Sequence, residues 1–299
     1  MQYRSYQHIE KLGNKAVEGI LKGRCSIQPK IDGTNGVVWL GDDGIVHAGS
    51  RKRDLTLDND NAGFYNTIIH NENIKSYLLE HPDHYLYGEW LVPHTIKYYD
   101  PSAWKHFYVF DVYSDERCYI PYNEYSKELD KFGIKYIPEI ISIVDPTIDD
   151  LTKCLKESKY LIPEDKMGEG IIIKNYSYRN PYGRCIFAKI VAEEFFDTKS
   201  KLRTKNHEVK NMIDEKDIVE RLLSEPLIRK EFAKIKLEYP EIKKQELIGR
   251  TLNTIFHVFI SEELLDYAEK KKPVINFYYL KKECDGRIKE VLKNELLSR

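Results

Sequence analysis

The sequence predicts an α+β fold of mainly antiparallel sheets with flanking helices, followed by an all-helical region. Short apolar segments rich in β-branched and aromatic residues fill the first two hundred residues. They do not alternate strictly with helical segments, as the strands of a parallel sheet would. After about residue 205, apolar residues recur instead at spacings of three and four. We therefore expect two domains, residues 1–204 and 205–299.

Six segments of the first domain are expected to form strands. They are residues 36–40, 44–49, 84–92, 106–113, 170–176 and 185–191. The first two form a hairpin signal, because Gly-Asp-Asp-Gly at 41–44 supplies a turn between them. Helical patterning intervenes around residues 62–80, 122–132 and 147–159.

The second domain reads as a bundle of about four or five helices. Its apolar stripes include Ile228, Phe232 and Ile235. Pro226 and Pro240 are expected in the first turns of helices, where a missing backbone N–H costs little.

Composition indicates a globular protein that is not built into a membrane. Of its 299 residues, 41% are hydrophobic and 32% charged, and no apolar run approaches the roughly 18 residues of a membrane span. We expect a monomeric, cytoplasmic protein, in the host cytoplasm if it is viral. Five scattered cysteines without a CxxC pair suggest neither a disulfide framework nor a zinc site.

Charge is unevenly divided along the chain. Residues 1–198 carry 24 basic against 30 acidic side chains, whereas residues 199–299 carry 23 against 18. A basic C-terminal part is compatible with a polyanionic partner. A solvated helical surface of mixed charge would look the same.

The run Lys-Ile-Asp-Gly-Thr-Asn-Gly at 30–36 places Lys30 between an apolar, strand-like approach and a glycine-rich bend. A lysine amine attacks phosphorus only when neutral, and its ordinary pKa is about 10.4. Neighbouring cations lower that pKa and also suit a triphosphate. The alternative is a surface hairpin with an exposed lysine.

Later segments supply charged residues inside apolar strands, where charge is costly unless paired or functional. Arg51 follows the hairpin, and Glu89 lies in the aromatic strand Tyr-Gly-Glu-Trp-Leu. The other candidates are Phe110 and Asp111 in Phe-Asp, Glu169 and Lys174 in Glu-Gly-Ile-Ile-Ile-Lys, and Lys189 in Phe-Ala-Lys-Ile-Val.

In this order, the segments resemble the motifs of the covalent nucleotidyltransferase superfamily of polynucleotide ligases and mRNA capping enzymes. The resemblance covers roughly residues 3–200, and its details are similar to RNA ligases of the phage T4 RNA ligase 2-like family and the trypanosome editing ligases. DNA ligases and capping enzymes usually carry arginine where this chain has Asn35. The resemblance implies a nucleotidyltransferase (adenylation) domain at 1–204 and a helical domain with possible RNA binding at 205–299.

The same resemblance implies a role for each residue. Lys30 would take AMP from ATP, while Lys174 and Lys189 would lie on the phosphates. Glu89 would bind the ribose, Phe110 would stack on adenine, and Glu169 would help to hold Mg²⁺ or Mn²⁺. Arg51 and Asn35 would position pyrophosphate or the RNA ends.

Each role has a structural alternative. Glu89 can be a salt-bridged strand residue, Phe110 ordinary core and Lys174 the end of an edge strand. Asp111 is expected to be mainly structural, and the basic neighbours of Arg51 leave the choice among them open. One departure stands out, because many members of the resembled family have Lys-x-Lys in the last motif and Phe187 occupies the first position here.

Three functions remain in competition. The leading hypothesis is an ATP-dependent RNA ligase that joins RNA 3′-OH and 5′-phosphate ends through lysyl-AMP and RNA-adenylate intermediates, in RNA repair, on nicked duplex or bridged ends. The alternatives are a GTP-dependent RNA capping guanylyltransferase and a catalytically inert RNA-binding protein. The nucleotide that becomes covalently attached distinguishes the two enzymes.

Overall fold

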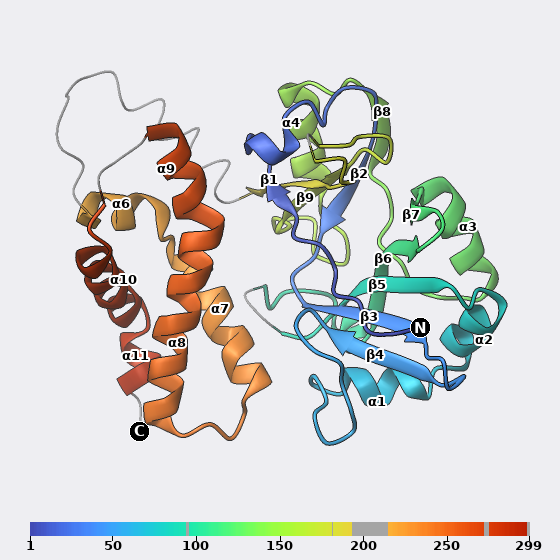
Figure 1. Cartoon of the computed structure of the whole chain (residues 1–299), viewed down its shortest axis with the longest axis horizontal. Helices are drawn as coiled ribbons and strands as arrows, with labels where there is room; N and C mark the ends of the chain where they lie inside the picture. The colour runs from blue at the N-terminus through green and yellow to red at the C-terminus, as the bar shows by residue number, and fades with distance from the viewer. Residues whose placement is uncertain (94–95, 181, 193–214, 272–274, 298–299) are drawn as a thin grey trace. The chain divides into compact units, whose positions relative to one another are not determined.

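The computed structural model divides the chain into two compact units, Met1–Lys205 and Asn206–Arg299 (Figure 1). The structure describes residues 1–93, 96–180, 182–192, 215–271 and 275–297. The predicted domain boundary between residues 204 and 205 lies outside the described residues, so its position stays a proposal.

One five-stranded sheet of the N-terminal unit, the first sheet, has the order β1-β10-β9-β2-β8. Its strands are β1 (Glu10–Lys11), β10 (Ala188–Val191), β9 (Gly170–Lys174), β2 (Arg24–Lys30) and β8 (Ile141–Val144). Neighbouring strands are antiparallel except for β1 and β10, which pair in parallel. The first sheet therefore brings the first strand of the chain beside one that begins almost 180 residues later.

The other five-stranded sheet, the second sheet, is antiparallel throughout and has the order β4-β3-β5-β6-β7. Its strands are β4 (Val46–Ser50), β3 (Thr34–Leu40), β5 (His84–Trp90), β6 (Phe107–Ser114) and β7 (Cys118–Ile120). The predicted β3–β4 hairpin is present, and the Gly41 N–H donates to the Ile45 carbonyl across the turn at 2.8 Å.

In the described part of the N-terminal unit, four α-helices and two short 3₁₀ turns accompany the sheets. They are η1 (Lys15–Val17), α1 (Phe64–Ile69), α2 (Glu72–Glu80), η2 (Pro101–Ala103), α3 (Tyr122–Lys131) and α4 (Ile148–Glu157). The helical patterning predicted around 62–80 corresponds to two helices, because the Asn71 side chain accepts a hydrogen bond from the Ile74 N–H and caps the start of α2. In Figure 1, α1 and α2 lie along the second sheet, where they pack on β4 and β3.

The two faces of the first sheet differ in character. One face packs Ile27 of β2 and Ile171 and Ile173 of β9 against Leu151 and Leu155 of α4. Because side chains alternate along a strand, the opposite face carries the residues in between. Those include the three lysines that the sequence singles out, Lys30, Lys174 and Lys189, so the core on one face fixes the direction of these cations.

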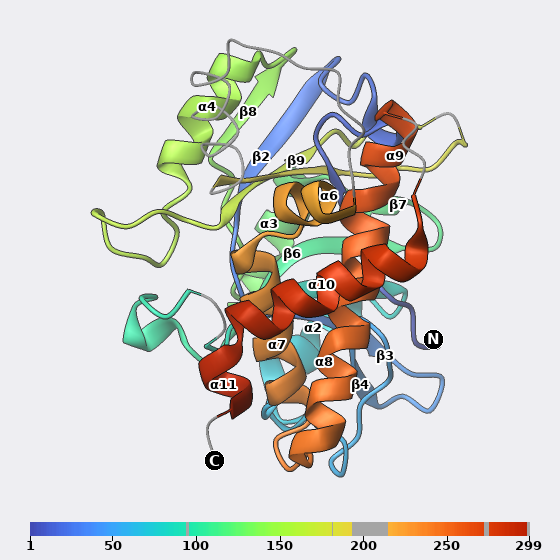
Figure 2. The same ribbon diagram turned by 90° about the vertical axis from the view of Figure 1, so that its left-hand side faces the viewer.

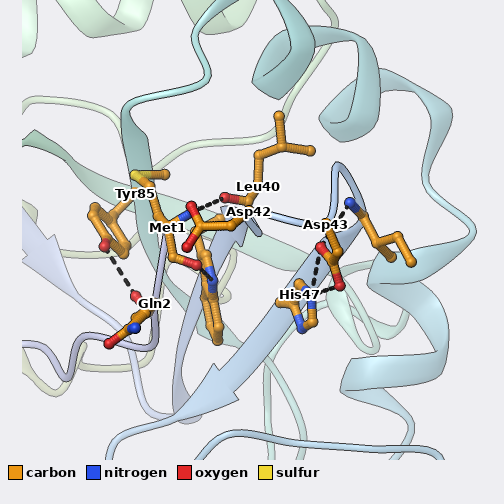
Figure 3. Close-up of polar contacts among 9 residues, drawn as sticks. Met1, Gln2, Leu40, Asp42, Asp43, His47 and Tyr85 are labelled. Atoms are coloured by element: carbon orange, nitrogen blue, oxygen red, sulfur yellow. Dashed lines mark hydrogen bonds and ion pairs between the residues drawn. The ribbon is translucent and has the colours of Figure 1, made fainter.

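The first residues of the chain contact the second sheet through hydrogen bonds and an ion pair (Figure 3). The Met1 ammonium donates to the Leu40 carbonyl at 2.9 Å and pairs with the Asp42 carboxylate at 2.7 Å. The Tyr85 hydroxyl donates to the Gln2 carbonyl at 2.9 Å. These contacts hold the segment before β1 along the second sheet.

The C-terminal unit is helical, as predicted. Its elements are α6 (Glu215–Leu222), α7 (Glu225–Glu238), α8 (Lys244–Phe259), the π-helical turn η3 (Ile260–Leu264), α9 (Leu265–Lys271), α10 (Phe277–Val291) and α11 (Lys293–Leu297). Figure 2 shows α10 crossing α7 and α8, on which it packs through a shared apolar core that includes Phe232, Ile255 and Leu280. Pro226 lies in the first turn of α7, as expected, whereas the expectation for Pro240 is wrong because it follows α7 and α8 begins only at Lys244.

The predicted α+β class with a helical C-terminal region is confirmed. Within the described part of the chain, no helix has the length and apolar character that a bilayer crossing requires. All five cysteines are free thiols, and those at 25, 154 and 284 are buried.

Candidate active site

Lys30 is the last residue of β2, where the chain leaves the first sheet to enter β3 of the second (Figure 1). It lies directly opposite Gly170, the first residue of β9. Glu169 immediately precedes that glycine, and its Oε2 atom lies 2.6 Å from the Lys30 Nζ. The two side chains are only 19% and 11% exposed. Pairing of β2 with β9 therefore holds the candidate nucleophile against a carboxylate.

The segment between β2 and β3, residues 31–33, is the crossing between the sheets. Hydrogen bonds of its backbone and side chains hold it in place. The Asp32 N–H donates to the Tyr99 hydroxyl at 2.8 Å, and the Asp32 carboxylate accepts from the Ile96 N–H at 2.9 Å. The Gly33 N–H donates to Glu89 Oε1 at 2.9 Å. Burial raises the pKa of the Tyr99 hydroxyl, which therefore stays protonated. These bonds set the direction in which Lys30 leaves the sheet.

Gly33 is required by a close approach of two backbone segments. A Cβ at this position would lie 2.5 Å from the Trp90 carbonyl oxygen and 2.9 Å from the Glu89 side chain. Both contacts are closer than non-bonded atoms tolerate, so any larger residue must push the crossing away from β5.

We expect Gly33→Ala to lower the free energy of unfolding by about 1–3 kcal/mol, the usual cost of overpacking a filled site. Thermal unfolding measures the effect. Gly249→Ala is the matched control, because a Cβ on this α8 residue meets no atom within 4 Å and alanine favours helix. Equal unfolding midpoints for Gly33→Ala and the wild type would show that the crossing is looser than described.

Glu89 and Asn35 lie side by side on one face of the second sheet. Asn35 of β3 pairs with Glu89 of β5, which pairs in turn with Tyr108 of β6. Among the described residues, nothing donates a hydrogen bond to the Asn35 Oδ1 atom, although this atom is shielded from solvent. A buried polar atom without a partner is costly, so this position suits a ligand group that hydrogen-bonds to the amide. The Asn35 amide offers an oxygen or, after a flip, an NH₂ group.

Phe110 lies at an irregularity in β6. Val109 pairs with Gly88 and Asp111 with Tyr87, so Phe110 is the extra residue of a β-bulge, a feature that redirects side chains and often occurs beside active sites. Its ring is half-buried and lies 4.9 Å from the ring of Tyr6. Phe110 is thus neither fully buried core nor fully exposed surface.

Lys174 of β9 contacts this bulge through its ammonium group. Its Nζ is hydrogen-bonded to the Phe110 carbonyl and lies 2.8 Å from Asp111 Oδ1, with 1% and 0% of the two side chains exposed. The Tyr6 hydroxyl donates to the other carboxylate oxygen at 2.5 Å. Burial lowers the pKa of Lys174 and raises that of Asp111, so each charge is costly without its partner. The structure thus gives Lys174 a buried ion pair, and its predicted contact with phosphates stays a prediction.

Lys189 of β10 lies opposite Ile172 of β9, which is on the same face of the first sheet as Lys30. It is half-buried. Phe187, two residues earlier on that face, is fully buried, and its ring centroid lies 5.5 Å from the Lys174 ammonium and 5.0 Å from the Tyr119 ring. The aromatic residue at 187 therefore covers Lys174 and takes no part in a polar surface.

Arg51 follows β4 and is exposed, and its Nη2 atom lies 3.0 Å from His8 Nδ1. Its described contact is thus with the segment before β1, and its predicted role toward a ligand stays a prediction. The Tyr99 hydroxyl was missed by the sequence analysis, because a tyrosine in a tyrosine-rich chain carries no distinguishing pattern. Asp111 was assigned a structural role. A carboxylate inside an apolar strand is costly without a partner, so its position in the sequence already indicated a buried partner.

No three His, Cys, Asp or Glu side chains of the described segments gather into a metal-binding cluster. Carboxylate oxygens at the site come from Glu169, beside Lys30, and from Glu89, beside Gly33. Two carboxylates are too few for a metal ion that is held by protein ligands alone. It is compatible with a hydrated Mg²⁺, which uses one or two carboxylates together with water and phosphate oxygens.

The profile of the RNA ligase family matches residues 23–191, more than half of the chain and the segment that contains Lys30, Glu89, Glu169, Lys174 and Lys189. The chain belongs to the RNA ligase family. A comparison with curated proteins finds no match.

Solved structures similar to this RNA ligase family member come from Naegleria gruberi and from an archaeon. An RNA ligase of N. gruberi is 17% identical with a TM-score of 0.49, covering 65% of this chain and 57% of its own. An archaeal ATP-dependent RNA ligase is 13% identical with a TM-score of 0.48, covering 87% of this chain and 65% of its own. The chain thus spans less than two thirds of the length of either structure.

Proposed function

We propose that this RNA ligase family member is an ATP-dependent ligase that joins RNA 3′-OH and 5′-phosphate ends in RNA repair. The observation that carries the proposal is the position of Lys30 at the crossing between the sheets, in contact with Glu169 and on the same face as Lys189. Lys30 would be the nucleophile, Glu169 the carboxylate and Lys189 the second cation in an attack on a nucleoside triphosphate.

The first step forms a bond between the Lys30 Nζ and the α-phosphorus of ATP and breaks the bond from that phosphorus to pyrophosphate. In the second, a 5′-phosphate oxygen of RNA attacks the AMP phosphorus and frees Lys30. In the third, an RNA 3′-hydroxyl attacks the activated 5′-phosphorus, and AMP leaves. Each step exchanges one phosphorus bond for another, so no oxidant or further reactant is needed.

Lys30 must lose a proton before it can attack, and the Glu169 carboxylate lies within hydrogen-bond distance at 2.6 Å. Entry of a nucleotide would separate this ion pair and leave the amine facing the α-phosphate. Lys189 would then stabilise the negative charge on the phosphates as the bond to pyrophosphate breaks.

Glu89 and Phe110 lie on neighbouring strands of the second sheet and would bind the nucleoside. The carboxylate of Glu89 accepts from the Gly33 N–H, which fixes the carboxylate beside the crossing, and it would bind a ribose hydroxyl. The half-buried ring of Phe110 would stack on adenine. Asn35 and Arg51 would contact pyrophosphate or the RNA ends.

Glu169 would hold a hydrated Mg²⁺ or Mn²⁺, and the ion would supply charge neutralisation on the phosphates. Solved structures of the N. gruberi RNA ligase contain ATP and Mn or AMP and Mn. The acceptor oxygens described here suit such a hard cation.

Lys174 would reach a phosphate only if its ion pair with Asp111 opened. In the arrangement described here it fixes the Phe110 bulge by holding the Phe110 carbonyl and the next side chain. We therefore propose that Lys174 orders the adenine-binding strand before the nucleotide binds and contacts the phosphates only afterwards.

RNA is the proposed polynucleotide, on nicked duplex or bridged ends, with the helical unit as a contact surface. Removing residues 205–299 should leave AMP transfer to Lys30 close to the wild-type rate but slow end joining by about tenfold or more, since phosphate contacts from lysines dominate nucleic-acid affinity. A gel assay of nicked RNA duplexes measures joining, and label incorporation from ATP measures the first step. Undiminished joining by the truncated protein would refute a substrate role for the helices.

A further inference from the structure

Residues 175–187 connect β9 to β10, and hydrogen bonds hold this connection against the turn before β2. The Asn175 Nδ2 group donates to the Ile20 carbonyl at 3.0 Å. The Tyr178 hydroxyl donates to the Glu18 carbonyl at 3.0 Å. These bonds give the connection a fixed position on the N-terminal unit.

The connection displays one aromatic ring between two arginines. The buried Asn180 side chain accepts hydrogen bonds from the Tyr182 and Arg184 N–H groups at 3.0 and 2.9 Å. Gly183 has a φ of 74°, a left-handed conformation that glycine adopts without strain. These features fix the backbone around Tyr182, which is nevertheless 83% exposed. Arg179 and Arg184 are exposed on either side of it in the sequence.

The positive charge of the connection is not neutralised within it. Its sequence contains two arginines and no acidic residue. Across the part of the chain that the structure describes, no carboxylate pairs with Arg179 or Arg184. The Arg179 Nη1 atom donates to the Tyr176 and Tyr178 carbonyls at 2.8 and 2.9 Å. These bonds orient the guanidinium and leave its other N–H groups for a ligand.

The connection lies at the end of β9 that is remote from the proposed nucleophile. Gly170 of β9 is opposite Lys30, and Lys174, the last residue of β9, is opposite Ser26. Because a strand rises about 3.3 Å per residue, these two positions are about 13 Å apart along the sheet. An RNA strand that ends at Lys30 would therefore meet the connection with nucleotides beyond the reacting one.

Two guanidinium groups without an acidic partner favour a polyanion, whose phosphates bind them through charge-assisted hydrogen bonds. Single exposed aromatic residues are common on protein surfaces, but an aromatic ring beside arginines is a combination that binds single-stranded nucleic acid. We propose that the connection is an RNA-contact loop, in which Arg179 and Arg184 bind phosphates and the Tyr182 ring stacks on an unpaired base. This inference rests on the proposed function, because the polyanion is taken to be the RNA substrate.

The test measures binding of a labelled single-stranded RNA oligonucleotide to the full-length protein by fluorescence anisotropy, at several salt concentrations. The variants are Arg179→Gln/Arg184→Gln, Tyr182→Ala and Tyr182→Phe. The matched control, Lys75→Gln/Lys131→Gln, removes the same amount of charge from exposed lysines of α2 and α3. Thermal unfolding of each variant and AMP labelling of the wild type from ATP accompany the binding data.

The arginine double variant should bind the RNA about tenfold more weakly at about 0.15 M salt. The slope of log affinity against log salt concentration should become shallower by about 1.4, because each lost phosphate contact of a single strand contributes about 0.7. Tyr182→Ala should weaken binding by about fivefold or more, the effect of losing one stacked base. Tyr182→Phe keeps the ring and should bind like the wild type, as should the lysine control. Unfolding midpoints should stay equal, because the three replaced side chains are exposed.

An arginine double variant with the affinity and salt slope of the lysine control would overturn the RNA-contact loop. Equal losses in Tyr182→Ala and Tyr182→Phe would overturn the stacking of the ring on a base. A wild type that labels with ATP but does not bind the RNA would overturn this inference and leave the first step of the proposed function standing. A wild type that takes no label from ATP, yet binds RNA through these three residues, would contradict the proposed function and leave the RNA contact standing.

Discussion

Lys30→Ala is expected to abolish covalent transfer of AMP to the protein, with a loss of at least about 10³-fold, because removing a nucleophile has effects of that size or larger. The Lys30 side chain is 19% exposed and lies on the face opposite the apolar core of the first sheet, so its replacement should not disturb that core. Label incorporation from ATP, read after denaturing electrophoresis, measures the effect.

Lys22→Ala serves as the control for Lys30→Ala, because this lysine lies just before β2 and is exposed. Its labelling should equal that of the wild type. Thermal unfolding of Lys30→Ala should stay near the wild-type midpoint, which separates lost chemistry from lost folding. Persistent labelling of Lys30→Ala would remove Lys30 from the proposal.

Lys174→Met is expected to destabilise the N-terminal unit by about 3–5 kcal/mol, the usual cost of leaving one charge of a buried ion pair without its partner. Asp111 is fully buried and would keep only the hydrogen bond from Tyr6. That loss is a large part of the roughly 5–15 kcal/mol that stabilises a typical domain. Denaturant unfolding measures the change.

The double variant Lys174→Met/Asp111→Asn should recover most of this stability, because it removes the uncompensated charge and keeps an acceptor for Tyr6. Lys153→Met is the matched surface control, since Lys153 pairs with Asp150 at 3.6 Å while 73% exposed, and its loss should have little measurable effect. Wild-type stability of the single variant Lys174→Met would mean that Lys174 and Asp111 are not a buried pair in solution.

The longer elements of the fold were predictable from the sequence. The hairpin of β3 and β4, the apolar strand β9 and the capped helix α4 each have a clear local pattern. Strands β1, β7 and β8 have two to four residues, too few for any periodicity, and exist because longer strands pair with them.

Single residues of the site were predictable by type, but their partners were not. Lys30 and Glu169 are 139 positions apart, and only the pairing of β2 with β9 brings them into contact. Lys174 of β9 was expected on the phosphates, which stays a prediction, and its buried partner Asp111 comes from β6 of the other sheet.

The central claim is that this chain carries AMP on Lys30. The most direct measurement incubates the full-length protein with ATP or with GTP and a divalent cation, then maps the modified peptide by mass spectrometry. The account predicts one AMP on the peptide that contains Lys30 and no adduct from GTP. An adduct from GTP would support a capping guanylyltransferase, and AMP on another residue, or no adduct from either nucleotide, would contradict the claim.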